Sequence, residues 1–162
     1  MNKKIFFVLV ALAASLLLFG CTQGADGSTN SFKSVDNSVC TIEGKPIVRM
    51  YSTNTCPHCL WVGPAYDEVV EKYVDENKII AYHWEWIVDA PVRSGDDLLT
   101  PENEEQVPDA ETKVFEQFTP EGYVPTFVFG CKYYRIGNEF EQQKDLNAER
   151  AEFDRIIQEL LK

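Results

Sequence analysis

Tyr51-Ser-Thr-Asn-Thr-Cys-Pro-His-Cys59 joins two segments of different pattern. Residues 46–52, before the cysteines, begin with a proline and carry apolar side chains that are typical of a strand, while residues 60–74, after them, have helical character. Two cysteines three positions apart at the start of a helix place both sulfur atoms on one side of its first turn, close enough to bond. The stretch therefore predicts a strand, a helix, and a reactive cysteine pair where they meet.

The position of Cys56 favours its thiolate form, because backbone N–H groups at the start of a helix point outward and the helix dipole is positive there. The thiolate is the nucleophilic form of cysteine. Pro57 suits the first helical position, where its missing N–H would be unpaired in any residue. His58 is expected to add a positive charge or a hydrogen bond beside the Cys56 sulfur. Cys59, one turn into the helix, is expected to be more shielded and to keep its proton.

The remaining sequence predicts an α/β domain with a mixed sheet. Residues 79–88 are dense in β-branched and aromatic side chains and predict a second strand, parallel to the first. Residues 89–109 carry prolines and acids and predict a loop, before a short helix at 109–118. Residues 126–129 and 133–136 predict a hairpin of two strands. An apolar stripe at helical spacing predicts a final amphipathic helix; it consists of Phe153, Ile156, Ile157, Leu160 and Leu161.

Two motifs resemble those of thioredoxin-like proteins. Cys56-Pro-His-Cys59 is similar to the active-site motif of DsbA-type oxidases, and Pro64 matches the proline that thioredoxins carry in the helix after the cysteines. Gly122-Tyr-Val-Pro-Thr126, followed by an apolar strand, resembles the loop of this family that holds a cis-proline opposite the cysteines. The resemblance covers residues 39–162 and implies a thioredoxin fold. It implies a cis bond before Pro125, and a Val124 backbone left free to bind an extended substrate peptide.

The sequence departs from the family in two places. The buried carboxylate that the family often has six residues before the first active cysteine is replaced by Met50. The proton of the second cysteine would then pass to water or to another group. DsbA-type proteins also insert a helical domain before the cis-proline, whereas only residues 89–109 are available here. A fold closer to plain thioredoxin, with a mixed central sheet flanked by helices, is therefore expected.

A structural disulfide and half of a zinc site are the alternative interpretations of Cys56 and Cys59. Zinc sites need four ligands, and the only two histidines are His58, between the cysteines, and His83, which the pattern assigns to a strand as a packed residue. No metal site is therefore expected. Trp61 is interpreted as an aromatic residue at the rim of the site, where it could shape a peptide-binding patch.

The N-terminal segment resembles an export signal. Lys3 and Lys4 precede an apolar run over residues 5–19, which is shorter than the roughly 20 residues that span a bilayer. The run ends at Gly20-Cys21, which resembles the lipobox of prokaryotic lipoproteins, in which the cysteine carries the lipid. A short uncleaved anchor is the alternative. Residues 1–20 are thus interpreted as a lipoprotein-type signal peptide, 21–38 as a flexible tether, and 39–162 as the domain, held at the outer face of the cytoplasmic membrane.

The other cysteines suggest a second disulfide. With Cys21 lipidated, four cysteines remain, and four allow three pairings in an oxidising compartment. In the fold that the resemblance implies, the strand after the cis-proline runs antiparallel to the strand before Cys56. Its far end, at Cys131, then returns toward Cys40 at the opposite end of the sheet. We expect a structural Cys40–Cys131 disulfide, with two buried free thiols as the alternative.

These features together predict disulfide exchange with protein or peptide thiols outside the cytoplasm. No organic cofactor is implied beyond the redox-active disulfide, and a membrane redox partner is expected to recharge the pair. A thioredoxin-fold copper(I) metallochaperone and a reductase of the cytochrome-maturation type are the alternatives. The net charge is −11, and without Lys3 and Lys4 it is −13, from 13 of the 15 basic and all 26 acidic residues. Nucleic acid is therefore an unsuitable partner, because phosphate backbones are bound by clustered Lys and Arg.

Overall fold

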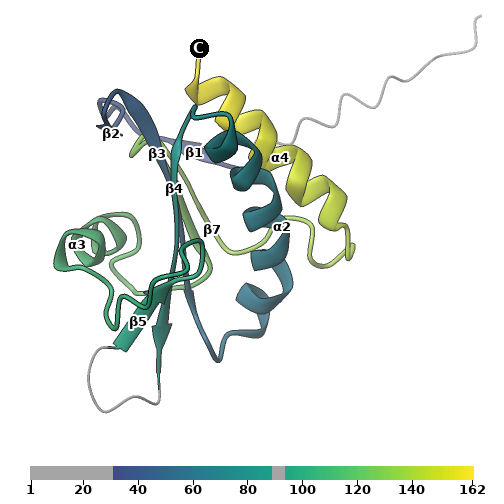
Figure 1. Cartoon of the computed structure of the whole chain (residues 1–162). Helices are drawn as coiled ribbons and strands as arrows, with labels where there is room; N and C mark the ends of the chain where they lie inside the picture. The colour runs from purple at the N-terminus through teal and green to yellow at the C-terminus, as the bar shows by residue number, and fades with distance from the viewer. Residues whose placement is uncertain (1–30, 89–93) are drawn as a thin grey trace, which may run out of the picture.

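The computed structural model describes residues 31–88 and 94–162. Three helices lie around a sheet in this part of the chain (Figure 1). In chain order the elements are β1 Lys33–Ser34, β2 Thr41–Ile42, β3 Lys45–Thr53, α2 Pro57–Asp75, β4 Ile80–Ile87, β5 Ser94–Asp97, α3 Asp109–Phe118, β6 Thr126–Phe129, β7 Tyr133–Ile136 and α4 Leu146–Leu160.

The sheet is mixed, as the sequence predicts. Its strand order is β1-β7-β6-β3-β4-β5, and the short β2 pairs with β3 beside this path. β3 and β4 are parallel and are connected through α2, while β6 pairs antiparallel with β3 and forms a hairpin with β7. The predicted parallel unit, the hairpin and its orientation relative to β3 are all confirmed. The chain is thus a mixed α/β protein with a central sheet flanked by helices.

The two faces of the sheet bury different clusters, because successive side chains on a strand point to opposite sides. On β3, Val48 and Met50 face the core beneath α2 and α4, whereas Tyr51 belongs to a second cluster on the α3 side. Figure 1 shows α2 and α4 side by side on one face and α3 on the other. Phe153 of the C-terminal helix is fully buried in the first core, as its apolar stripe predicts. The sheet is thus covered by helices on both faces.

The folded part begins earlier than the predicted boundary at residue 39. Lys33 and Ser34 form β1 and pair antiparallel with Tyr134 and Tyr133 of β7. Phe32 is only 3% exposed and its ring lies 4.9 Å from that of Phe129. The polar composition of residues 22–38 suggested a tether throughout, but the burial of Phe32 and the pairing of β1 with β7 dock its C-terminal part onto the edge of the sheet.

Residues 89–109, predicted as a loop, contain the edge strand β5, which pairs antiparallel with β4. Its sequence, Ser-Gly-Asp-Asp, has no strand propensity, so the strand depends on its neighbours. A Cβ atom on Gly95 would lie 2.6 Å from Val107 Cγ2 and 2.8 Å from the carbonyl oxygen of Glu85. Only glycine therefore allows the chain to approach β4 so closely here.

None of the helices in residues 31–88 and 94–162 is both long and apolar enough to cross a membrane. The apolar run at 5–19 and the predicted lipidation site Cys21 lie outside the described residues.

Candidate functional site

Cys56 and Cys59 form a disulfide at the start of α2, with their Cα atoms 5.2 Å apart. Cys56 is the N-cap residue: its backbone is extended, and its Sγ accepts a hydrogen bond from the N–H of Cys59 at 3.1 Å. Pro57 occupies the first helical turn, and no acidic residue stands in that turn. The sulfur therefore takes the place of the usual capping oxygen and satisfies one of the N–H groups that a helix start leaves unpaired.

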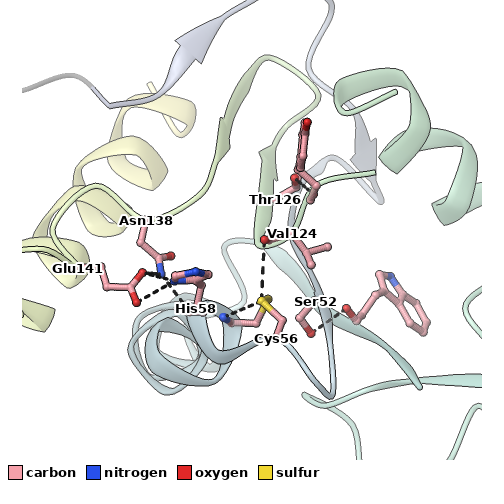
Figure 2. The surroundings of a disulfide bond; sticks show 10 residues. Ser52, Cys56, His58, Val124, Thr126, Asn138 and Glu141 are labelled. Carbon is pink, nitrogen blue, oxygen red and sulfur yellow. Dashed lines mark hydrogen bonds and ion pairs between the residues drawn. A yellow bond between two sulfur atoms is a disulfide. The ribbon is translucent and has the colours of Figure 1, made fainter. Parts of the chain in front are cut away.

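The Val124–Pro125 bond is cis, as the resemblance implies. Pro125 is buried, and the Val124 carbonyl oxygen lies 3.9 Å from Cys56 Sγ (Figure 2). Strand β6 begins only at Thr126, so Val124 precedes the paired part of that strand. A hydrogen bond fixes the loop on both sides of Val124, because the Thr126 hydroxyl donates to the carbonyl of Tyr123 at 2.7 Å. A backbone segment outside the sheet thus faces the disulfide.

His58 is positioned differently from the expectation that its imidazole lies beside the Cys56 sulfur. Its Nδ1 lies 2.8 and 2.9 Å from the two carboxylate oxygens of Glu141, in the segment between β7 and α4. Asn138 holds this arrangement by donating both to the carbonyl of His58 and to Glu141. Within residues 31–88 and 94–162, no hydrogen bond joins the imidazole to Cys56. Glu141 can reach His58 because the segment between β7 and α4 runs beside the start of α2, as Figure 2 shows.

This contact also affects the ionisation of Glu141. Partial burial opposes its charge, but the hydrogen bonds from Asn138 and His58 outweigh that penalty, and the pKa of the Glu141 carboxyl is lower than usual. A carboxylate is therefore the partner of His58, a residue between the two cysteines, which the sequence analysis did not predict. No sequence signal indicates it, because Glu141 is 83 residues from His58.

The two cysteines are buried, whereas several residues around them are exposed. Cys56 is 8% exposed and Cys59 3%, so the second cysteine is the more shielded, as predicted. Around them, Pro57 and His58 are exposed. Leu60 and Tyr123, which were not predicted as site residues, are 62% and 61% exposed. Leu60 belongs to the start of α2, and Tyr123 lies two residues before the cis-proline.

Trp61 and His83 are more buried than Leu60 and Tyr123. Trp61 is partly buried and packs against the core beneath α2 and α4, and a contact between it and a substrate stays a prediction. His83 is 4% exposed in β4, so its interpretation as a packed strand residue is confirmed. Within the described ranges, no group of three or more His, Cys, Asp or Glu side chains is arranged to hold a metal ion.

Cys40 and Cys131 form the second disulfide, with Cα atoms 5.5 Å apart, which confirms the predicted pairing. The Cys40 N–H donates to the carbonyl of Gly130, and the Gly130 N–H donates to that of Ile47, so the backbone itself brings the cysteines together. Gly130 and Cys131 both have positive φ, as the tight turn between β6 and β7 requires. This disulfide lies near the start of β3, whereas Cys56 follows its end.

No family profile, no curated protein and no solved structure matches the chain. What the site can do is therefore inferred from its geometry. A disulfide across the first turn of a helix, with one sulfur accepting an N–H bond, can open to a thiolate that keeps this bond and gains strength from its charge. The second sulfur, one turn in and nearly fully buried, is positioned to close the bond again.

Proposed function

We propose that this protein is a thiol-disulfide oxidoreductase of thioredoxin fold that exchanges disulfides with protein or peptide thiols through Cys56 and Cys59. The observation that carries the proposal is the cysteine pair at the N-terminus of α2, with the cis Val124–Pro125 bond facing it. The mixed sheet, with the parallel β3 and β4 and the antiparallel β6 and β7, is the arrangement that a thioredoxin fold requires.

The proposed reaction has two displacement steps. In the reducing direction the Cys56 thiolate attacks one sulfur of a client disulfide, which forms a mixed disulfide and releases the other client sulfur as a thiolate. Cys59 then loses its proton and attacks Cys56, which re-forms the Cys56–Cys59 bond and releases the second client thiolate. The client is reduced and the protein oxidised. In the oxidising direction the same steps run in reverse. The exchange needs no organic cofactor.

The surroundings of the pair suit an extended peptide as the client. The backbone of Val124 lies outside the paired part of β6 and next to Cys56, so it is available to a peptide strand laid across the site. Leu60, at the start of α2, and Tyr123, in the loop before the cis-proline, offer exposed apolar surface. The proposed client is therefore an unfolded or flexible segment that carries a cysteine, bound by its backbone and by its apolar neighbours.

We further propose that the protein works outside the cytoplasm, tethered to the membrane through lipid on Cys21, and that a membrane redox partner recharges it. The support is in the sequence: a lysine-led apolar run ends at Gly20-Cys21. The Cys40–Cys131 disulfide is consistent with this location, because such cross-links persist in oxidising compartments.

Substituting Cys59 by serine is expected to trap a mixed disulfide. In the full chain carrying Cys21→Ser, which removes the lone N-terminal thiol, the reduced Cys59→Ser variant should react with a disulfide-containing test peptide and remain joined to it through Cys56. The attack still occurs, but the resolving thiol is absent. Mass spectrometry after alkylation detects the adduct and its position.

Cys56→Ser in the same background is the matched control. Its remaining thiol, on Cys59, is nearly fully buried and should form no adduct. Equal trapping by both variants, or by neither, would show that the pair is not an exchange site. Stoichiometric, tight binding of copper(I) by the reduced wild-type chain, in the absence of trapping, would favour the metallochaperone instead.

Glu141→Gln is expected to raise the reduction potential of the Cys56–Cys59 pair. The carboxylate contacts His58, the residue next to Cys59 and one removed from Cys56, so its removal takes a negative charge away from the site and leaves the Cys56 thiolate, and hence the reduced form, better stabilised. An ion pair between partly exposed side chains contributes about 0.2 to 1 kcal/mol, which corresponds to about 5 to 20 mV for a two-electron couple. Equilibration with glutathione buffers measures the shift.

The exposed Glu139, two positions away, provides a matched control as Glu139→Gln. It removes the same charge from the same loop without the His58 contact, and a smaller shift is expected. A lower potential for Glu141→Gln would contradict the electrostatic argument. The wild-type value itself separates an oxidase, near about −120 mV, from a reductase nearer the thioredoxin value of about −270 mV.

A further inference from the structure

A cavity of about 170 Å³ lies directly beneath the site, between α2 and the sheet. Three of its lining residues, Cys59, Gly63 and Asp67, follow one another at intervals of one helical turn along α2. Three others, Ser52, His83 and Glu85, come from the facing strands. The cavity therefore leads from the resolving cysteine along the helix to a set of polar side chains that the proposed exchange does not yet use.

The register of the parallel strands brings His83 to this cavity. Met50 and Ser52 of β3 pair with His83 and Glu85 of β4, and side by side in a sheet these residues share one face. That face is the one that α2 covers. A Cβ atom on Gly63 would lie 3.1 Å from Cε1 of His83, so the imidazole packs against the helix backbone where there is no side chain. His83 thus lies one turn beyond Cys59.

Asp67, one turn further along α2, orients the imidazole. Its Oδ1 lies 2.7 Å from Nδ1 of His83, and the His83 side chain is 5% exposed. A carboxylate at Nδ1 keeps the proton on that nitrogen and leaves Nε2 as the acceptor in the neutral ring. In the described part of the chain, Nε2 of His83 has no protein partner. The unpaired nitrogen belongs to a residue that lines the same cavity as Cys59.

Few other charged groups face this imidazole. From β5, Asp97 accepts a hydrogen bond from the His83 backbone N–H at 2.8 Å, and burial is the main reason that the pKa of its carboxyl is raised. Glu85 lines the cavity from β4, and the ring of Tyr66 on α2 lies edge-on to the imidazole at 5.8 Å. The neighbours on β3, Met50 and Ser52, carry no charge. Asp67 is the only one of these groups with a side-chain contact to the imidazole nitrogens.

We infer that the Asp67–His83 pair accepts the proton of Cys59 when this cysteine resolves the mixed disulfide. The Cys59 S–H bond breaks and its proton passes, through water that the cavity is large enough to hold, to Nε2 of His83. The Cys59 sulfur then forms a bond to Cys56 while the Cys56–client bond breaks and the client leaves as a thiolate. In the opposite direction the imidazolium returns the proton. His83 is the base, and Asp67 is a positioning residue that acts through it.

This inference rests on the proposed exchange function, and its test separates the two. The reduced full chain, carrying Cys21→Ser, is mixed with a chromogenic aromatic disulfide in a stopped-flow instrument. Attack by Cys56 releases the first aromatic thiolate, and resolution by Cys59 releases the second. If neither release occurs in the wild type, the exchange function itself fails. If both occur, the rate of the second phase reports on the proton acceptor.

His83→Asn is the decisive variant, because the asparagine amide can still donate to Asp67 but offers no base at the position of Nε2. The second phase is expected to slow about 100-fold near neutral pH, within the range that a positioned general base contributes, while the first phase is unchanged. The slow phase should accelerate in proportion to hydroxide concentration toward the ordinary thiol range, roughly pH 8.5. Recovery at high pH would not follow from mere damage to packing.

Two further variants separate the loss of the proton acceptor from a change in packing. Asp67→Asn, on the partly exposed face of α2, leaves His83 in place and is expected to slow the second phase less than His83→Asn does. If His83→Asn does not fold, Asp67→Asn serves as the test of the proton acceptor. Met50→Leu alters packing beside the imidazole without changing a charge, and should leave both phases unchanged. A second phase with wild-type rate and pH profile in the histidine and aspartate variants would overturn the inference, and so would equal slowing of both phases.

Discussion

Replacing Cys40 and Cys131 together by serine is expected to lower the free energy of unfolding by about 4 to 5 kcal/mol. The cysteines are 91 residues apart in sequence, so the cross-link removes a large share of the conformational entropy of the unfolded chain. Most of the domain lies inside the loop that it closes. Guanidinium unfolding followed by circular dichroism measures the loss, and thermal unfolding should show a midpoint lower by about 10 to 20 °C.

Serine is the appropriate substitute because of Arg49. This buried guanidinium lies 3.3 Å from Cys40 Sγ and makes two hydrogen bonds to the Glu111 carboxylate, at 2.6 and 3.0 Å. Burial alone would lower the pKa of Arg49, but Glu111 outweighs that cost and the pKa is raised. A hydroxyl at position 40 can still accept from the arginine, so the measured loss reports the cross-link and not an unpaired charge.

Cys56→Ser with Cys59→Ser is the matched control, since that disulfide spans only three positions. The same chain-entropy argument gives about 2 kcal/mol for so short a loop. A larger loss for this pair than for Cys40 and Cys131 would contradict the assignment of the long-range disulfide as the structural one. The Cys40/Cys131 variant should also still release both aromatic thiolates, because its substitutions lie away from the exchange site.

The parts of the fold that the sequence predicts are those with strong local patterns. Residues 126–129 and 133–136 were predicted as strands and form β6 and β7 with the same bounds, because apolar runs flank a glycine-containing turn. β5 could not be predicted in this way. Its Ser-Gly-Asp-Asp sequence forms a strand only because Gly95 fits against β4 and Val107, a contact that depends on tertiary structure.

The residues of the candidate site also differ in whether a local sequence pattern predicts them. Cys56, Cys59 and Pro125 were predictable because each belongs to a short motif whose local geometry is fixed by its own sequence. Glu141 and Asp67 were not, because each acquires its position from a distant partner: Glu141 reaches His58 from the loop before α4, and Asp67 reaches His83 across the helix–sheet interface. Local patterns thus identify the sulfur chemistry, while packing determines the charges around it.

The loop that carries Glu141 depends on a buried ion pair. Arg135 of β7 and Glu149 of α4 are 4% and 0% exposed in their side chains, and Arg135 Nη2 lies 2.6 Å from Glu149 Oε2. The other oxygen of Glu149 accepts from the N–H groups of Glu139 and Phe140, both at 2.9 Å. The guanidinium also stacks near three phenylalanine rings, 4.8 to 5.1 Å from their centroids. One carboxylate therefore neutralises the cation and fixes the loop.

Glu149→Gln is expected to cost about 3 to 5 kcal/mol of unfolding free energy, the range for a buried ion pair that loses one partner. The amide oxygen can still accept from the loop N–H groups, but its NH₂ group faces the guanidinium, and the buried positive charge loses the carboxylate in direct contact with it. Burial already lowers the pKa of Arg135, and Glu149 opposes this most strongly, ahead of Glu152 and Glu139. Chemical denaturation at several pH values measures the loss.

Arg135→Met, made alone and together with Glu149→Gln, completes a double-mutant cycle. Methionine suits the ring-lined space that the guanidinium occupies, so the double variant should recover much of the stability that Glu149→Gln loses. If the loss in the double variant equals the sum of the losses in the two single variants, the two side chains do not stabilise the fold as a pair. If the loop is loosened in Glu149→Gln, Glu141 is also released from His58, and the Cys56–Cys59 potential should rise as in Glu141→Gln. A stability loss without that rise would mean that Glu141 keeps its position independently of the buried pair.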